Sequence, residues 1–228
     1  MEKLKIIYED NHIIVVEKKP NIPSQSDKTG DIDMLTLVKQ YIKEKYNKPG
    51  NVYVGLVHRL DRPVGGLMVF AKTSKAASRL SNQVREKTIK KQYLAVVDGK
   101  FKENKGMLEN YLYKDERNNV SKVVDKNKKG AKLAKLDYEV LGYKPDKNLS
   151  LVKIDLHTGR HHQIRVQLSN FGHSIFGDQK YGTRGKGKQI ALWAYNLQIE
   201  HPISKEKMNF KLLPENKGTW KWDIEDKQ

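Results

Sequence analysis

The stretch Val57–Thr73, with the sequence VHRLDRPVGGLMVFAKT, decides how the rest of the chain is organised. Its polar segment His58–Arg62 lies between two apolar runs, Val52–Val57 before it and Leu67–Ala71 after a proline and two glycines. Short apolar runs that are bounded by glycine or proline are typical of buried strands. The sequence therefore predicts that the one carboxylate of this segment, Asp61, lies on a tight turn between two core strands.

Two arginines, Arg59 and Arg62, flank Asp61 within two residues. A guanidinium beside a half-buried carboxylate favours the ionised form of that carboxylate. A rigidly held, ionised carboxylate is what nucleophilic or general-base catalysis requires. A solvated turn with two local ion pairs would show the same pattern, so this stretch by itself leaves a catalytic site and a charged turn both open.

The chain is strongly basic: its 228 residues include 44 lysines and arginines against 27 aspartates and glutamates, a formal net charge of +17 at pH 7. Such an excess points to a polyanionic partner, either a nucleic acid or an anionic membrane, although a general lysine bias of the proteome would produce it too. The lysines are scattered along the whole chain rather than gathered in one amphipathic helix, which argues against a binder of membrane surfaces or acidic proteins.

The arginines are few and unevenly placed. Eight of the 44 basic residues are arginine, and four of these eight fall within His58–Arg62 and Thr158–Arg165. In a chain that otherwise uses lysine, arginine is expected where its planar, permanently charged guanidinium is needed. The distribution therefore predicts that these two segments belong to one site.

Several kinds of chemistry lack the residues they need. The sequence has no cysteine, which excludes a disulfide framework, a thiol nucleophile and a cysteine metal site, and fits a cytoplasmic protein. His157 and His161 have the spacing of helical ligands, but a glycine between them starts the helix and no third ligand is nearby, so no metal is predicted. Motifs for a nucleophile elbow, a phosphate-binding loop, a dinucleotide site, a signal peptide or a membrane span are absent from the sequence.

Hydrophobic periodicity predicts one continuous α+β domain over residues 1–228, a mainly antiparallel sheet flanked by a few helices and loops. The expected helices and caps are Met34–Tyr46 with Asp33 or Asp31, Lys75–Lys87 with Thr73 or Ser74, and a third that is capped by Thr158 and ended by Gly172. Besides the two runs around the Asp61 turn, the expected strands are Leu4–Tyr8, His12–Val16, Lys90–Val97, Gly106–Tyr113, Asn119–Val124, Lys132–Gly142, Leu149–Leu156, Gln189–Glu200 and Met208–Leu212.

Four segments resemble, in order, the motifs of the RluA family of pseudouridine synthases. His58–Thr73 resembles the family's catalytic-aspartate motif, and Val15–Pro20 (VVEKKP) looks like its N-terminal "vvnKP" segment. Lys91–Gly99 is similar to the K-x-Y-x-A-x-V-x-G strand. Leu156–Leu168, followed by Gly177–Gly182, resembles the L-x-T-G-R-x-H-Q-I-R segment and the GD-x-x-YG loop. Together these matches span most of the chain and are far more specific than any one of them.

The resemblance implies the pseudouridine synthase fold and an isomerase that converts uridine to pseudouridine in rRNA or tRNA, without cofactor or metal. No obligate protein partner is evident from the sequence. Asp61 would be the catalytic aspartate, acting on the flipped uridine either by covalent attack or by abstracting a ribose proton. Tyr93 would lie against the uracil and help to remove the C5 proton. Arg165 would pair with Asp61 and keep it ionised and oriented.

The resemblance also implies a set of residues that bind the RNA or the flipped base. These are His58, Arg59, Leu60, Arg62, Arg160, His162, Gln163 and Ile164. Within this set, Arg62 would reach into the space that the flipped base vacates. Leu60 and Ile164, with the strand at Leu67–Phe70, would supply apolar walls inside which the freed uracil rotates.

The chain departs from the family's pattern at several positions. Gly65 stands where the family has threonine or serine, which should loosen the local hydrogen bonding of the turn, and Trp193 replaces a histidine near the last long strand. The loop Asn21–Thr29 lacks the family's usual sequence motif. The chain starts at the first strand of the catalytic domain, so an S4 RNA-binding domain is expected to be absent. The alternative to an enzyme is a catalytically silent RNA-binding relative, against which the presence of Asp61 and its predicted partners argues.

Overall fold

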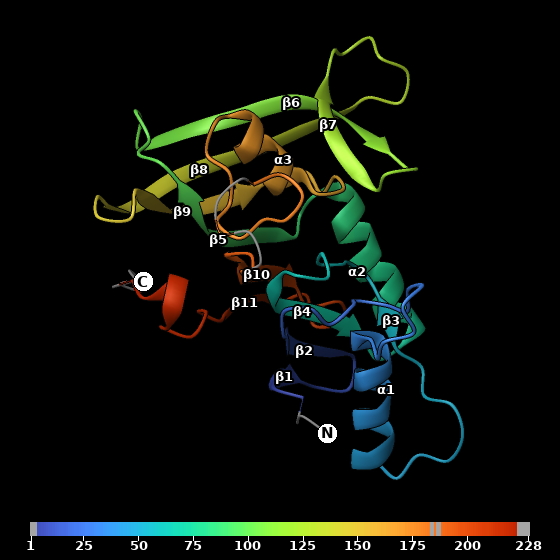
Figure 1. The fold of residues 1–228 in the computed structure, drawn as a ribbon. Coiled ribbons are helices and arrows are strands. Elements are labelled where there is room, and N and C mark those ends of the chain that lie inside the picture. Colours follow the sequence, from blue (N-terminus) through green and yellow to red (C-terminus); the bar gives the residue numbers. More distant parts are fainter. Residues whose placement is uncertain (1–3, 183–184, 186–187, 223–228) are drawn as a thin grey trace. The chain divides into compact units, whose positions relative to one another are not determined.

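Strand β4, Gly65–Ala71, is buried along its whole length and organises the N-terminal part of the fold. The computed structural model describes residues 4–182, 185 and 188–222. The chain divides into two compact units, Met1–Lys90 with Ala194–Leu213 and Lys91–Trp193 with Pro214–Gln228 (Figure 1). That the whole chain acts as one catalytic domain stays a prediction.

The first unit is a sheet of mainly antiparallel pairs with two helices. Its strand order is β1-β2-β4-β10, with β11 beside β10 and β3 beside β4. The bounds are Ile6–Glu9 for β1, Ile13–Lys18 for β2, Gly55–Leu56 for β3, Leu192–Glu200 for β10 and Lys207–Lys211 for β11. Strand β2 pairs with β4 from Ile13 opposite Ala71 to Lys18 opposite Gly66, so the end of β2 lies beside the start of β4.

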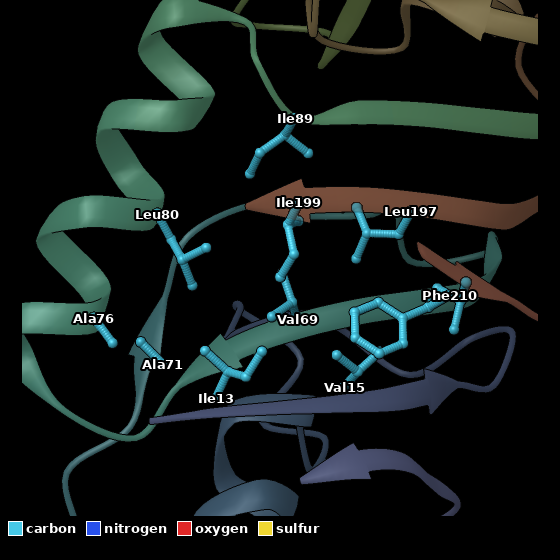
Figure 2. Packing of buried hydrophobic residues seen from close by; sticks show 11 residues of the cluster. Ile13, Val15, Val69, Ala71, Ala76, Leu80, Ile89, Leu197, Ile199 and Phe210 are labelled. Carbon is cyan, nitrogen blue, oxygen red and sulfur yellow. The ribbon is translucent and has the colours of Figure 1, made fainter. Parts of the chain in front are cut away.

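Side chains on one face of β4 form the core of this unit. Val69 and Ala71 pack with residues of β2, β10, β11 and the second helix, α2 (Ser74–Glu86), as Figure 2 shows. The buried members of the cluster are Ile13, Val15, Leu67, Val69, Ala71, Ala76, Leu80, Ile89, Leu197, Ile199 and Phe210. Because side chains alternate along a strand, Met68 and Phe70 point to the opposite face and are also fully buried. Burial on both faces explains the continuous apolar sequence of β4.

The two helices of the first unit begin at caps that the sequence predicted. The Asp33 carboxylate accepts a hydrogen bond from the Thr36 N–H at the start of α1 (Met34–Lys45). The Thr73 hydroxyl accepts one from the Ala76 N–H at the start of α2. The prediction of a full strand over residues 52–57 is wrong, because only Gly55–Leu56 pairs, opposite the last two residues of β4. Strand β10 takes that edge of β4 in the sheet order.

The second unit is an antiparallel sheet with the order β5-β9-β8-β6-β7. The bounds are Lys90–Asp98 for β5, Lys105–Asp115 for β6, Val120–Val124 for β7, Lys132–Lys144 for β8, Leu149–Leu156 for β9, Gln163–Asn170 for α3 and Gly218–Trp220 for a 3-10 turn. Helix α3 packs on the sheet through Val166, which joins a small core with Leu112 and Ala134. The predicted strands are confirmed to within a few residues at their ends.

The start of α3 corrects a prediction. Thr158 was expected to cap this helix, but the helix begins five residues later, after His162, whose φ of 53° lies in the left-handed region. The Thr158 hydroxyl instead accepts the Lys135 N–H at 2.8 Å and donates to the Gln163 side-chain oxygen at 2.7 Å. Its hydrogen bonds therefore tie the segment before α3 to β8. Among the described residues, no helix is long and apolar enough to cross a membrane.

Candidate active site

The turn that carries Asp61 is closed by its own backbone and pinned at its start. The Val64 N–H donates to the Asp61 carbonyl oxygen at 3.0 Å, which closes a four-residue turn with Pro63 inside it. Before the turn, the Nε2 atom of His58 accepts the Val69 N–H at 3.1 Å, so the histidine is fixed on β4. Asp61 is half-buried. The carboxylate therefore stands on a short, well-anchored loop at the edge of the core.

A second anchor comes from the loop after β2. The Ser24 hydroxyl donates to the Leu60 carbonyl oxygen at 2.8 Å and lies 3.1 Å from the Leu60 N–H, which donates to it. The Asn21 N–H donates to the Arg62 carbonyl oxygen at 2.8 Å. The Leu60 side chain is 6% exposed. The residues on either side of Asp61 are thus both held by the segment that follows β2.

The third anchor is a buried ammonium group. Lys18, the last residue of β2, is 0% exposed, and its Nζ donates to the carbonyl oxygens of Val64 at 2.6 Å, Arg62 at 2.8 Å and Lys19 at 3.2 Å. Burial lowers the pKa of Lys18 to about 7, while the negative charge of Asp61 acts in the opposite direction. A cation buried next to the turn therefore feels the charge of the Asp61 carboxylate.

The two glycines after the turn have different roles. Gly66 has a φ of 122°, and a Cβ atom there would lie 2.2 Å from the Ala194 carbonyl oxygen, so this position requires glycine. Gly65 is the buried first residue of β4. The anchors of the turn act on residues 58, 60, 62 and 64. The turn is therefore held by hydrogen bonds that need no side chain at Gly65, and the looser local bonding expected there stays a prediction.

Arg62 is engaged by an acidic loop of its own unit. Its Nη1 atom donates to Thr29 Oγ1 at 2.9 Å and to Asp27 Oδ2 at 3.3 Å, and its Nη2 atom pairs with Asp31. Hydrogen bonds from Thr29 and the Arg62 guanidinium lower the pKa of both carboxyl groups. Arg59 is exposed. That these two arginines bind RNA stays a prediction, and Arg62 would have to exchange carboxylate oxygens for phosphate oxygens to do so.

Tyr93 and Arg165 lie in the second unit, each in a defined setting. Tyr93 is on β5 opposite Ile154 of β9 and is 6% exposed. Arg165, on α3, is 4% exposed and forms a two-pronged pair with Asp178, with Nε–Oδ2 and Nη2–Oδ1 distances of 2.7 Å. Although burial acts to raise the pKa of Asp178, the hydrogen bond and charge of Arg165 hold it below its usual value. Arg165 also lies over the Tyr181 ring, 5.2 Å from its centre.

The other predicted residues of the second unit have internal partners. Gln163 accepts hydrogen bonds from the Thr158 hydroxyl and the Arg160 N–H, and its amide donates to the Lys135 carbonyl oxygen at 3.1 Å. The exposed Arg160 donates from Nε to a backbone carbonyl of β8 at 2.9 Å. The Nδ1 atom of His162 lies 2.7 Å from the Tyr181 hydroxyl. These contacts shape the loop before α3, and RNA binding by this group, with the buried Ile164, stays a prediction.

Asp61 belongs to the first unit, and Tyr93 and Arg165 belong to the second. The pairing of Arg165 with Asp61 that the sequence predicted therefore stays a prediction. Within the described part of the chain, no three histidine, aspartate or glutamate side chains are grouped so that they could hold a metal ion.

Sequence reasoning did not single out three residues that shape the site. Lys18 and Ser24 hold the Asp61 turn, and Asp178 holds Arg165. A signal existed for two of them. Lys18 ends a strand whose first four residues are apolar, and Asp178 stands in the GD-x-x-YG loop. Ser24 gave no signal, because a serine in a polar loop is ordinary.

The chain is similar in sequence to known RNA pseudouridine synthases. The sequence model of the family described as RNA pseudouridylate synthase matches residues 12–170. The chain is 34% identical over 208 residues to an RNA pseudouridine synthase of Bacillus subtilis, YhcT, covering 90% of this chain and 66% of that protein. It is 32% identical over 219 residues to ribosomal large subunit pseudouridine synthase D of Zymomonas mobilis, covering 91% of this chain and 68% of that protein. The chain thus spans about two thirds of the length of these relatives.

Solved structures give the same result for the fold. Human RNA pseudouridylate synthase domain containing 4 superposes with a TM-score of 0.77 at 20% identity, covering 91% of this chain and 87% of that one. Human RNA pseudouridylate synthase domain containing 1 gives 0.74 at 24% identity, covering 94% and 84%. At these identities the likeness concerns the fold, and it confirms the predicted α+β architecture.

Proposed function

The chain belongs to the RNA pseudouridylate synthase family, which confirms the family and the enzyme class predicted from the sequence, and we propose that it isomerises specific uridines in RNA with Asp61 as its catalytic residue. The observation that supports this proposal most directly is the anchoring of the Asp61 turn. Backbone and side-chain hydrogen bonds from β2, the loop after β2 and β4 converge on that turn. A carboxylate held in this way needs little reorganisation when it acts on a substrate.

The reaction breaks one bond and forms another within the same nucleotide. The N1–C1′ bond of uridine breaks, the freed uracil turns inside the pocket, and a C5–C1′ bond forms. The C5 proton is then lost and N1 gains a proton, so that the reaction is an isomerisation. Asp61 either attacks C1′ or removes a proton from the ribose, and Tyr93, from β5, would lie against the uracil and assist the loss of the C5 proton.

The target base has to leave its helix or loop before Asp61 can reach it. Unstacking a base costs a few kcal/mol in general, and contacts to the RNA backbone have to offset this cost. Lysine and arginine side chains, which give the chain its formal net charge of +17, provide such contacts along much of its length. Arg62, next to Asp61, is the side chain best placed along the sequence to fill the space that the base vacates.

The proposed substrate is a structured cellular RNA, and ribosomal RNA is the candidate that the relatives favour. Relatives at 32% identity from Zymomonas mobilis and Nitrosomonas europaea are ribosomal large subunit pseudouridine synthases D. Transfer RNA is the second choice. Pseudouridine mapping of total RNA from cells with and without this gene identifies the position, because a site that depends on the gene must vanish in its absence.

The catalytic assignment is tested with Asp61→Ala on an RNA that contains the mapped position. This variant should form no pseudouridine but bind the RNA with an unchanged Kd. Asp146→Ala is the matched control, because Asp146 is an exposed aspartate in the turn between β8 and β9. Normal turnover by Asp61→Ala would refute the mechanism. RNA binding without any turnover by the wild-type protein would favour a catalytically silent RNA-binding relative instead.

A further inference from the structure

The end of α1 carries an exposed aromatic ring surrounded by lysines, which the proposed mechanism does not use. Tyr46 follows the last buried residue of the helix, Ile42, by four positions, so it continues the buried stripe of α1 beyond the end of the helix. At that position Tyr46 is 46% exposed. Three ammonium groups lie over its ring, at distances from the ring centre of 4.9 Å for Lys72, 5.3 Å for Lys45 and 5.9 Å for Lys48.

The ring is held in place by a buried carboxylate. The Tyr46 hydroxyl donates to Glu9 Oε1 at 2.9 Å, and the same carboxylate accepts hydrogen bonds from Lys72 at 2.6 Å, Lys45 at 2.7 Å and Tyr41 at 2.9 Å. Although burial acts to raise the pKa of Glu9, these hydrogen bonds lower it to about 2. The carboxylate is therefore ionised at neutral pH, and it fixes a ring that loses little freedom when a ligand stacks on it.

Further lysines of the same segment are available to an anionic ligand. Residues 34–50 contain four lysines and one glutamate. A hollow of about 370 Å³ between α1 and residues 50–52 is lined by Lys39, Lys43 and neutral residues. Within the part of the chain that the structure describes, Lys39, Lys43 and Lys48 form no ion pair with a carboxylate. These three ammonium groups therefore keep their full charge for a partner.

The helix dipole explains only part of this arrangement. It favours lysines in the last turn of a helix, which accounts for Lys43 and Lys45. It does not account for Lys48 and Lys72, which lie outside α1, or for the exposed ring. A membrane surface would need a free apolar face beside the lysines, but the apolar stripe of α1 is buried in the protein. A fixed ring among ammonium groups is instead the arrangement on which single-stranded nucleic acids stack their bases.

We propose that Tyr46 and the lysines around it form a second RNA-binding surface, on which an unpaired base stacks on the Tyr46 ring while Lys39, Lys43 and Lys48 bind phosphates of neighbouring nucleotides. The inference rests on the proposed function, because it takes RNA as the substrate. Lys48 has the most distant ammonium group over the ring. An incoming base takes its place, and the displaced ammonium group binds a phosphate.

This surface lies away from the catalytic turn. Lys72 directly follows the last residue of β4, whereas the Asp61 turn precedes the first. The seven residues of β4 separate the two by about 20 Å. Only an RNA that extends well beyond the modified uridine can reach both. The surface should therefore affect the KM for long RNA and leave kcat unchanged.

The role of the ring is tested by binding of a fluorescein-labelled oligouridine of about 12 nucleotides, with an RNA duplex of the same length for comparison. Tyr46→Leu should raise the Kd for oligouridine about tenfold and the Kd for the duplex less than about twofold, because paired bases cannot stack on the ring. Tyr46→Phe loses the same hydrogen bond to Glu9 but keeps the ring, so its Kd should stay within about twofold of the wild-type value. Equal losses in the two variants, or no loss in Tyr46→Leu, would overturn the proposal.

The role of the lysines is tested by the salt dependence of oligouridine binding. Lys43→Gln/Lys48→Gln should make the slope of log Kd against log salt shallower by about 1.4, the value for two lost phosphate contacts on a single strand. Lys207→Gln/Lys211→Gln removes the same charge from exposed positions of β11 and should retain the wild-type slope. An equal change in both double variants would overturn the proposal, since net charge alone would then determine the affinity.

Turnover separates this surface from the proposed function. On an RNA that contains the mapped position, Tyr46→Leu should raise KM about tenfold with kcat within about twofold of the wild-type value. On the same RNA shortened to the few nucleotides around that position, it should match the wild type. If Asp61→Ala is inactive while Tyr46→Leu has the wild-type KM on long RNA, the proposed function stands and this surface is overturned. If the wild type modifies no RNA but binds oligouridine through Tyr46, the proposed function fails and the surface stands.

Discussion

Gly66→Ala tests whether the close approach of β4 and β10 fixes the strand that carries the Asp61 turn. Gly66 has a φ of 122°, and an added Cβ would lie 2.2 Å from the carbonyl oxygen, 2.6 Å from the nitrogen and 2.7 Å from the carbonyl carbon of Ala194. All three are backbone atoms, so no side-chain rotation can relieve the contact. One of the two strands would have to move by the order of 1 Å.

Two terms set the expected loss of stability. A residue with a side chain at positive φ costs about 1–2 kcal/mol relative to glycine. Forcing extra volume into a packed region costs about 1–3 kcal/mol more. Together they predict that Gly66→Ala lowers the free energy of unfolding by about 2–5 kcal/mol, a large part of the about 5–15 kcal/mol that holds a typical domain folded.

Chemical denaturation monitored by tryptophan fluorescence measures this loss, and Gly50→Ala separates its two parts. Gly50 also has a positive φ, 75°, but a Cβ there would have no atom within 4 Å. Gly50→Ala should therefore lose only the backbone term, about 1–2 kcal/mol. If the two variants lose the same amount, the contact with Ala194 is not what requires glycine, and the close packing of β4 against β10 would be refuted.

Two further predictions concern charge. Burial lowers the pKa of Lys18 from an ordinary 10.5 to about 7, so the unfolded chain binds this proton more tightly than the folded protein does. The free energy of unfolding therefore rises as the pH rises between these two pKa values. Between about pH 7 and pH 9 the wild type should gain about 2 kcal/mol relative to Lys18→Met in urea titrations, and parallel pH curves for the two proteins would contradict this. The double variant Asp27→Asn/Asp31→Asn frees the Arg62 guanidinium and should bind RNA several-fold more tightly, with a slope of log Kd against log salt that is steeper by about one phosphate contact. The gain should vanish when Arg62 is also replaced by alanine, and a gain that persists would show that the acidic loop acts only through its general charge.

The parts of the fold that were predictable are those that depend on local patterns. Strand β4 was recognisable because both of its faces are buried, which makes the sequence continuously apolar. The caps Asp33 and Thr73 were recognisable because a cap needs only a side-chain oxygen and a nearby N–H. The start of α3 was missed, since Thr158 has the composition of a cap but its hydroxyl is bound by Lys135 of β8, which is distant in sequence.

In the candidate site, too, the residues of contiguous motifs were predictable and those that depend on distant partners were not. Asp61 was predicted because its motif is contiguous, and the motif includes His58, whose ring is fixed on β4. Lys18 and Asp178 were not singled out, because their importance follows from partners 46 and 13 positions away in sequence. Long-range partners of this kind depend on strand register, and no periodicity within one segment reports that register.

The loop after β2 contacts both the turn that carries Asp61 and the Arg62 side chain that is proposed to bind RNA. Its first half fixes the turn, since Ser24 binds Leu60 on both its N–H and its carbonyl group. Its second half binds Arg62 through Asp27 and Asp31, side chains that are 39% and 53% exposed. Buried neutral hydrogen bonds persist in salt, whereas exposed ion pairs exchange readily with phosphates. Substitutions in the first half of this loop, around Ser24, should therefore affect kcat. Substitutions in the second half, at Asp27 and Asp31, should affect RNA affinity.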